Sequence, residues 1–378
     1  MINNLSPYKA YYQAQIKPNG TKTAVIKPFQ SCSNTVSFGS KFFTPKEIID
    51  FSNELSPDIL KTHLFKIASP ETCGRGVGSR GIEIAKNYIA EQFKALNLEP
   101  VKQFGLNDFF QEFQMGKYTT SLKEAGKSNM GMTYASTTNN LTKTANVLGM
   151  IRGYKNPEGF LILTAHYDHL GKLEGKNIVF PGADDNASSV SALLEIARIM
   201  KAKGPHEKSI IFAALSGEEF GKFGAMSLAS KIFDAKTAKH TEIVNVEMIG
   251  ATGGELLDIW KGRTNLSENI VKSFEEAGKA LNVKTETHKG MPCCDGQIFS
   301  FRQLPTITTT WDYKNTKIHP HYHTPKDTPE NVNMTAFEKA AKVISAACYV
   351  LANKTTDAPT EKRFTRFLSK LNPFKNKN

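Results

Sequence analysis

The sequence predicts a three-layer α/β fold, in which a twisted, mostly parallel sheet lies between two layers of helices. Continuous apolar runs at 160–165 (FLILTA) and 209–215 (SIIFAAL) are typical of strands that are buried on both faces. Between these runs, residues 188–200 place apolar side chains on one face of a helix. Strands and helices that alternate in this way indicate a parallel sheet covered on both sides.

Length and composition allow this fold and exclude several other classes. The 378 residues are 40% apolar and 22% charged, which suffices for one large domain or two ordinary ones with a filled core. This apolar share excludes a wholly disordered chain. No stretch approaches ~18 uncharged apolar residues, so a transmembrane helix is not expected.

The N-terminal part of the chain contains a leader and the first helices. Residues 1–44 are rich in Asn, Ser, Thr and Lys and predict a flexible basic leader. Order is expected to begin at Thr44, which can cap a helix whose first residue is a proline. Apolar side chains at helical spacing predict a helix over 82–96, and the polar stretch 116–143 predicts a loop or hairpin.

The C-terminal part continues the alternation of strands and helices. Apolar runs predict two further strands at 243–249 and 304–310, and a long helix over 333–351 closes the fold. We therefore expect a single folded domain over 45–355, followed by a basic tail over 356–378.

The net charge of +12 is concentrated at the two ends of the chain. The leader carries five Lys and no acid, and residues 359–378 carry six basic residues and one acid. The folded part is close to neutral, and a nucleic-acid-binding domain would instead concentrate its charge there. We therefore expect no nucleic-acid partner and interpret the ends as solvated, with weak affinity for anionic surfaces left open.

The C-terminal tail has a helical pattern of its own. Phe364, Phe367, Leu368 and Leu371 fall at helical spacing, with basic residues between them. Such a segment fits an amphipathic membrane anchor, and it also fits a short helix docked on the domain. The docked helix is favoured over membrane association.

The five cysteines and the N-terminus bear on the cellular compartment. The cysteine number is odd and no CxxC spacing is present, so neither a cysteine zinc site nor a disulfide framework is expected. The first twenty residues contain no apolar core typical of a secretory signal. These observations favour a reduced, cytoplasmic protein.

Side chains that bind metal ions follow the predicted strands. In chain order they are His166, Asp168, His169, Asp184, Asp185, Glu218, Glu219, Glu247 and His323. The carboxyl ends of parallel strands meet at one edge of a sheet, so we expect these side chains to lie close together. Each residue alone has a simpler explanation, such as a helix cap or a solvated acid. Together, the carboxylates would repel one another unless a divalent cation lay between them.

Four motifs at these positions resemble a known family. The segments AHYDHLG, PGADDNAS, SGEE and HTPKDT, in this order, are similar to zinc metallopeptidase family twenty-eight. That family includes bacterial leucyl aminopeptidases, glutamate carboxypeptidase and glutaminyl cyclase. The resemblance covers about 45–355 and implies a catalytic domain of the zinc exopeptidase type, with a sheet of about eight strands.

The resemblance implies a role for each motif residue. The implied metal ligands are His166 and Glu247 on one ion, Glu219 and His323 on the other, and Asp185 between them. Two Zn²⁺ per chain are therefore expected, with Co²⁺ or Mn²⁺ as alternatives. Glu218 would be the general base, and Asp168 would orient the His166 ring from behind. Tyr322 could donate a hydrogen bond to the oxyanion.

The sequence departs from the family pattern at three places. Glu247 stands where the family usually has Asp, so the ion it binds is expected to sit differently or bind more weakly. Ser189 replaces a usual Gly. The segment Cys294-Asp295-Gly296 stands where Ser-Asp-His is common, which leaves the wall of the substrate pocket open to question.

The function that this resemblance implies is hydrolysis of peptides from a free N-terminus by a di-zinc aminopeptidase. One alternative is cyclisation of an N-terminal glutamine by a single zinc ion. Another is a peptidase-like binding module without activity, although such modules lose metal ligands and this chain retains all five. The sequence does not specify the preferred N-terminal residue or the oligomeric state.

Overall fold

The computed structural model describes residues 43–122, 133–173, 175–313, 315 and 317–354. The basic tail lies outside these residues, as does the leader up to residue 42. Predictions for the leader and the tail therefore remain predictions. Within the described part, no helix combines the length and apolar character needed to span a bilayer.

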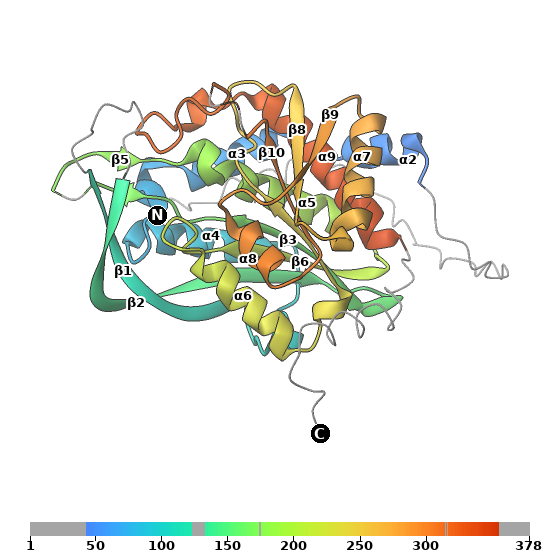
Figure 1. Ribbon diagram of the computed structural model, residues 1–378, viewed down its shortest axis with the longest axis horizontal. Coiled ribbons are helices and arrows are strands. Elements are labelled where there is room, and N and C mark those ends of the chain that lie inside the picture. The colour runs from blue at the N-terminus through green and yellow to red at the C-terminus, as the bar shows by residue number, and fades with distance from the viewer. Residues whose placement is uncertain (1–42, 123–132, 174, 314, 316, 355–378) are drawn as a thin grey trace, which may run out of the picture. The chain divides into compact units, whose positions relative to one another are not determined.

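An eight-stranded sheet forms the centre of the fold, in the order β1-β2-β6-β3-β7-β10-β8-β9 (Figure 1). The strands are β1 Phe110–Leu122, β2 Thr133–Ile151, β3 Asn156–His166, β6 Lys208–Leu215, β7 Thr241–Val246, β8 Leu256–Lys261, β9 Lys284–Lys289 and β10 Thr306–Trp311. A separate small pair consists of β4 Gly171–Lys172 and β5 Val179–Phe180. The strand number and the α/β class confirm the prediction.

The direction of the strands differs between the centre and the rim of the sheet. The four central strands β6, β3, β7 and β10 are parallel to one another. Towards one rim, β2 runs antiparallel to both β6 and β1, and towards the other, β8 runs antiparallel to β10. The sheet is therefore mixed, with the predicted parallel arrangement at its centre. Within the segment predicted as a loop or hairpin, β1 and β2 pair antiparallel as far as Leu122 and Thr133, and residues 123–132 lie outside the described residues.

Helices cover both faces of the sheet (Figure 1). They are α2 Pro45–Ser52, α3 Pro57–Ile67, α4 Arg80–Ala95, α5 Ser189–Lys203, α6 Phe223–Asp234, α7 Glu268–Ala280, α8 Asp295–Phe301 and α9 Met334–Asn353. The larger apolar core contains side chains of α2, α3, α4, α5, α7 and α9, and the smaller core contains those of α6 and α8. The three-layer arrangement follows from these two cores.

Strand β3 shows why a continuous apolar run predicts a central strand. Leu161, Leu163 and Ala165 point into the larger core, whereas Phe160 and Ile162 point into the smaller one. All five are at most 1% exposed, because successive side chains of a strand point to opposite faces. An alternating polar pattern would leave one layer of helices without apolar contacts.

The first helix begins where the sequence indicates. Thr44 accepts a hydrogen bond from Glu47 N through its side chain, and the Glu47 carboxylate accepts one from Thr44 N at 2.8 Å. This reciprocal arrangement satisfies main-chain donors that the first turn of a helix leaves free. Pro45 occupies the first helical position, where its missing N–H costs nothing.

Strand β7 is shorter than the sequence predicts. The apolar run suggests a strand to residue 249, but β7 ends at Val246. Met248 has a φ of 45°, a left-handed conformation that cannot continue a strand. Glu247 therefore lies just past the strand, at the edge where the other polar side chains are.

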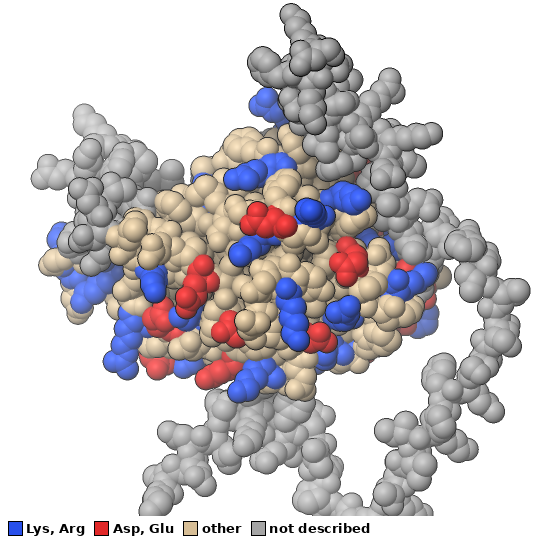
Figure 2. Space-filling model, turned by 90° about the horizontal axis from the view of Figure 1, so that it is seen from below, with Lys and Arg blue, Asp and Glu red and all other residues tan. Residues whose placement is uncertain are grey.

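The described surface carries both positive and negative side chains, and the described cysteines are not in disulfides. On the face shown in Figure 2, Lys and Arg side chains are interspersed with Asp and Glu among the described residues. Cys73, Cys293, Cys294 and Cys348 are all free thiols. The fifth cysteine, Cys32, lies outside the described residues.

Candidate metal centre

The parallel centre of the sheet brings the predicted metal ligands to one edge. His166 is the last residue of β3, Glu219 follows β6, and Glu247 follows β7. Asp185 lies in the helical turn Ala183–Ser188 that leads into α5, and His323 lies in the segment between β10 and α9. Residues that are up to 157 positions apart in the sequence thus meet because parallel strands end on the same side.

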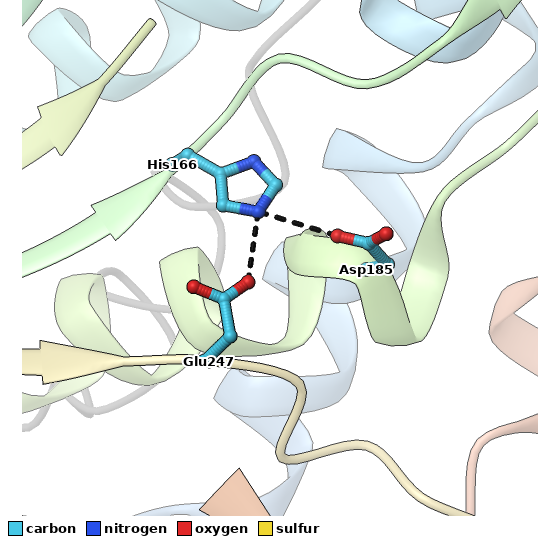
Figure 3. Close-up of side chains that lie close together, drawn as sticks. All are labelled: His166, Asp185 and Glu247. Carbon is cyan, nitrogen blue, oxygen red and sulfur yellow. Dashed lines mark hydrogen bonds and ion pairs between the residues drawn. The ribbon is translucent and has the colours of Figure 1, made fainter. Parts of the chain in front are cut away.

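The first group of ligands consists of His166, Asp185 and Glu247 (Figure 3). His166 Nε2 lies 2.9 Å from Glu247 Oε1 and 3.2 Å from Asp185 Oδ1. Each residue is at most 5% exposed. One ring nitrogen thus faces two buried carboxylates, which is an expensive arrangement unless a cation neutralises them.

The second group uses the other oxygen of Asp185. His323 Nε2 lies 3.1 Å from Asp185 Oδ2 and 3.1 Å from Glu219 Oε2. The Asp185 carboxylate therefore offers one oxygen to each group, as a ligand that bridges two ions would. The family resemblance implies the same grouping of these five residues, and their role as metal ligands stays a prediction.

The spacing of these atoms fits bound metal ions. Two ligand atoms of a tetrahedral zinc ion, each at about 2.0–2.1 Å, lie roughly 3.3 Å apart. The contacts of His166 and His323 with their carboxylates, between 2.9 and 3.2 Å, are close to this value. Imidazole nitrogen and carboxylate oxygen are donors that zinc accepts. The donor set and its spacing thus fit a pair of divalent ions.

The pKa values in the metal-free chain show how tightly the charges are coupled. Burial lowers the pKa of His166, but the carboxylates of Glu247 and Asp185 outweigh burial and hold that pKa well above its ordinary value. Burial also raises the pKa of Glu218 well above its ordinary range, and neighbouring acids raise it further. The acids of this edge are thus crowded enough to compete for protons, and a metal ion would relieve the same crowding.

Asp168 contacts both the His166 ring and the turn after β6, and its predicted role in orienting that ring stays a prediction. The Nδ1 atom of His166 lies 3.1 Å from the main-chain oxygen of Asp168 and 3.8 Å from its carboxylate, so the main chain holds the ring. The carboxylate instead accepts hydrogen bonds from Glu218 N and Glu219 N, at 3.2 and 3.4 Å. Asp168 is 0% exposed and therefore fixes the turn that carries the predicted base and its neighbouring ligand.

Glu218 faces a cavity beside the first group. The cavity has a volume of about 330 Å³, and Asp185, Glu218 and Glu247 all line it. The rest of its wall consists of Met248, Cys293, Cys294, Tyr313, His319, Pro320, Tyr322 and Thr324. The ammonium of Lys222 lies 3.8 Å from Glu218 Oε1. The cavity thus combines carboxylates with sulfur-containing and aromatic side chains.

Tyr322 also lines this cavity, and its ring stacks on the ring of His323. The two ring centroids are 3.8 Å apart and the planes differ by 21°. Tyr322 is 40% exposed. It therefore lies at the mouth of the site, where its hydroxyl can meet a ligand and its ring supports a predicted metal ligand.

The departure at Gly296 leaves the cavity wall intact. A Cβ atom on Gly296 would lie 2.1 Å from Thr308 Oγ1, so Thr308 fills the space where a side chain would start. Cys293 and Cys294 line the cavity instead.

The neighbouring Asp295 is 0% exposed, and burial raises the pKa of its carboxyl to about 8. Ser189 is 0% exposed at the start of α5.

Asp184 and Asp327 support the site, and sequence reasoning gave them no role. The Asp327 carboxylate accepts hydrogen bonds from Asp184 N and Asp185 N, at 2.8 and 3.1 Å. The Asp184 side chain accepts one from Gly250 N at 2.8 Å and contacts His319 Nδ1 at 2.5 Å. Asp327 is the acid of the HTPKDT motif, so its place in that motif was the signal that could have identified it.

Arg75 is a second supporting residue that the sequence did not reveal. It is 0% exposed, and its guanidinium donates to the main-chain oxygens of Tyr167, Gly182, Pro181 and Ile67, at 2.7, 2.7, 2.6 and 3.2 Å. Two of these oxygens belong to the segments that carry His166 and Asp185. Arg75 therefore ties together the loops on which the first group depends.

Replacing Arg75 should destabilise the metal-free protein. Arg75→Met leaves four buried carbonyls without this donor, and each such loss costs about 1–3 kcal/mol. We expect a total loss of roughly 4 kcal/mol, seen as a fall in Tm of about 10 °C in thermal unfolding. Arg75→Lys retains the charge but only part of the hydrogen bonds, so its Tm should lie between the two. Equal Tm values for all three proteins would show that the loops are held by other contacts.

His169 lies at the second group, although the sequence analysis gave it no role. Its Nδ1 atom is 2.6 Å from Glu219 Oε1 and 3.7 Å from Asp185 Oδ2. Its ring lies 5.7 Å from the ring of His323, edge to face. The second histidine of the HYDH segment is therefore part of the site.

Comparison with known proteins places the chain in a family. The sequence pattern of peptidase family M28 matches residues 146–348, more than half of the chain. The chain belongs to this family. All five predicted metal ligands lie within the matched residues, whereas Arg75 lies before them.

Curated relatives of this M28 chain are named as an aminopeptidase or as probable zinc metalloproteases. Aminopeptidase YwaD of Bacillus subtilis strain 168 is 26% identical over 224 residues, which are 58% of this chain and 47% of the relative. A probable zinc metalloprotease of Leptosphaeria maculans is 32% identical over 114 residues, 30% of this chain and 26% of the relative. The alignments thus cover at most about half the length of these curated relatives.

Solved structures confirm the fold of this M28 chain. An aminopeptidase from Aneurinibacillus sp. strain AM-1 matches with a TM-score of 0.63 and 15% identity, over 82% of this chain and 97% of that one. A glutaminyl cyclase from Macrostomum lignano matches with a TM-score of 0.59 and 17% identity, over 85% of this chain and 98% of that one. Because both identities are low, these likenesses concern the fold alone.

Proposed function

We propose that this chain is a zinc-dependent exopeptidase, most specifically a di-zinc aminopeptidase that hydrolyses N-terminal residues from peptides. The observation that carries the proposal is the Asp185 carboxylate, which offers one oxygen to each of two His–carboxylate groups. Membership of peptidase family M28 supports peptide hydrolysis, and the names of the relatives support zinc and aminopeptidase activity.

We assign each residue of the site a role in peptide hydrolysis. His166, Asp185 and Glu247 would hold one ion, and Asp185, Glu219 and His323 would hold the other. The ions supply the positive charge that polarises the scissile carbonyl and lowers the pKa of the attacking water. Glu218 takes the proton of that water and delivers it to the leaving amine. Tyr322, at the mouth of the cavity, is our candidate donor to the developing oxyanion.

The cavity supports an exopeptidase rather than an enzyme that cuts within chains. It has a volume of about 330 Å³, and Glu218 lines it beside the proposed ligands Asp185 and Glu247. A free N-terminal amine carries a positive charge and could be held there by an acidic side chain or near one metal ion, which would restrict cleavage to the end of the peptide. An acetylated N-terminus lacks this charge, so blocked peptides should be poor substrates.

The test uses the purified full chain and compares metal content with substrate choice. We expect about two zinc ions per chain and cleavage of aminoacyl fluorogenic substrates, with no cleavage of their N-acetylated counterparts. An N-terminal glutaminyl peptide and a peptide with a free C-terminal acid complete the panel. One zinc ion per chain together with cyclisation of the glutaminyl peptide would overturn the aminopeptidase in favour of a cyclase. Cleavage only from the C-terminus would indicate a carboxypeptidase.

A further inference from the structure

The imidazole of His169 is held rigidly beside the second group. It is 0% exposed, and its ring packs on Gly182, where a Cβ atom would lie 2.5 Å from Cγ and Cδ2 of the ring. Its Nε2 atom is buried and has no hydrogen-bond partner among the described residues. Its Nδ1 atom faces the site, 2.6 Å from Glu219 Oε1 and 3.7 Å from Asp185 Oδ2. The ligand atoms of these three residues lie close enough together to hold a metal ion, and the contact with Glu219 is the shorter of the two.

The contact between His169 Nδ1 and Glu219 Oε1 is the shortest His–carboxylate contact of the two groups, followed by the 2.9 Å contact of His166 with Glu247. Atoms that share one tetrahedral zinc ion lie roughly 3.3 Å apart, and His323 Nε2 is 3.1 Å from Glu219 Oε2. The 2.6 Å between His169 Nδ1 and Glu219 Oε1 is shorter and corresponds to a direct, charge-assisted hydrogen bond. An ionised carboxylate can only accept, so Nδ1 carries the hydrogen and donates it.

We propose that His169 is a positioning residue for the second metal ion, and that it acts by holding the Glu219 carboxylate. With Oε1 held by His169, the other oxygen, Oε2, faces His323 and is available to the ion. This inference rests on the proposed two-ion function. It goes beyond that function, because none of the ligand roles implied by the family motifs involves His169.

In the described structure, His169 has no hydrogen bond or ion pair with His166 or Glu247 of the first group, where Asn245 Nδ2 faces the other oxygen of Glu247 at 3.5 Å. There the His166 ring is held by the main-chain oxygen of Asp168, at 3.1 Å. Loss of the His169 side chain should therefore affect one ion and spare the other. Removing a partner that holds a metal ligand typically lowers metal affinity about 10–100-fold.

Two substitutions of similar polarity separate this role from simple packing. In His169→Asn the amide nitrogen lies near the position of Nδ1 and can still donate to Glu219. In His169→Gln the amide lies near the position of Nε2, which faces away from Glu219. We expect the Asn variant to bind both ions nearly as the wild type does, and the Gln variant to bind one ion about 10–100-fold more weakly.

The measurement is calorimetric titration of each metal-free protein with zinc, after thermal unfolding has shown that the variant folds. Titration with Co²⁺, read by its visible absorption, adds a spectroscopic signature of the ligand set. A Co²⁺ spectrum that changes in the Asn variant would overturn the positioning role, because it would mean that His169 is itself a ligand. Equal zinc affinities in the wild type, Asn and Gln variants would mean that the ring only packs.

The wild-type titration separates this inference from the proposed function. A single binding event in the wild type would contradict the two-ion site and thus the proposed function. Two wild-type events that persist unchanged in the Gln variant would contradict only the role of His169. The test does not use His169→Ala, which removes the packing of the ring and could prevent folding. The comparison of the Asn and Gln variants is sufficient.

Discussion

Glu218→Gln is expected to lower kcat by about 10²–10⁴-fold while leaving zinc binding unchanged. Glu218 lines the cavity, and no histidine lies within ion-pair distance of its carboxylate among the described residues. Its ion-pair partner there is Lys222, at 3.8 Å, so no predicted metal ligand occupies the carboxylate that would take a proton from water. The amide of Gln has nearly the same shape as the carboxylate but cannot accept that proton. The variant therefore tests proton transfer without creating a cavity.

Glu219→Gln is the matched control for this prediction. Glu219 contacts both His323 and His169, so its neutralisation should weaken zinc binding as well as activity. The two variants differ by one position, and steady-state kinetics with metal analysis of each purified protein distinguishes their roles. A Glu218→Gln variant with near-normal kcat would remove Glu218 from the mechanism.

The centre of the fold was predictable because its signal is local. The runs at 160–165 and 209–215 are apolar on both faces, and only a strand between two layers of helices requires this. The rim of the sheet is different. The antiparallel direction of β2 against β6 and of β8 against β10 depends on the path of the connections, which no local pattern encodes.

The ligands of the site were predictable for a similar reason, whereas their supports were not. His166, Asp185 and His323 lie in motifs of unusual composition at the ends of predicted strands. Arg75 is a single basic residue in a Gly-rich segment, and its partners are main-chain oxygens more than 90 positions away, apart from Ile67 O. Every residue has a main-chain oxygen, so the sequence does not indicate which of them accept these hydrogen bonds. Only the structure identifies the contacts.

Glu247→Ala is expected to remove one of two zinc ions and, with it, most of the activity. Glu247 is 5% exposed, and its ion-pair partner among the described residues is His166. Burial raises the pKa of its carboxyl in the metal-free chain. A buried carboxylate that lacks a cation costs several kcal/mol or takes up a proton. Since no Lys or Arg is paired with it in the described structure, a metal ion is the partner that removes this cost.

Calorimetric titration of the metal-free protein with zinc measures this prediction. The wild type should show two binding events, and the Ala variant should retain about one, with activity lost or recovered only at high zinc concentration. Glu247→Asp is the matched control, because it retains the charge and shortens the side chain by one methylene, to the length usual in the family. We expect the Asp variant to bind both ions, because it keeps a carboxylate beside His166 Nε2, which Glu247 Oε1 contacts at 2.9 Å. Two undiminished events in the Ala variant would contradict the role of Glu247 as a ligand, because the first ion would then be held without it.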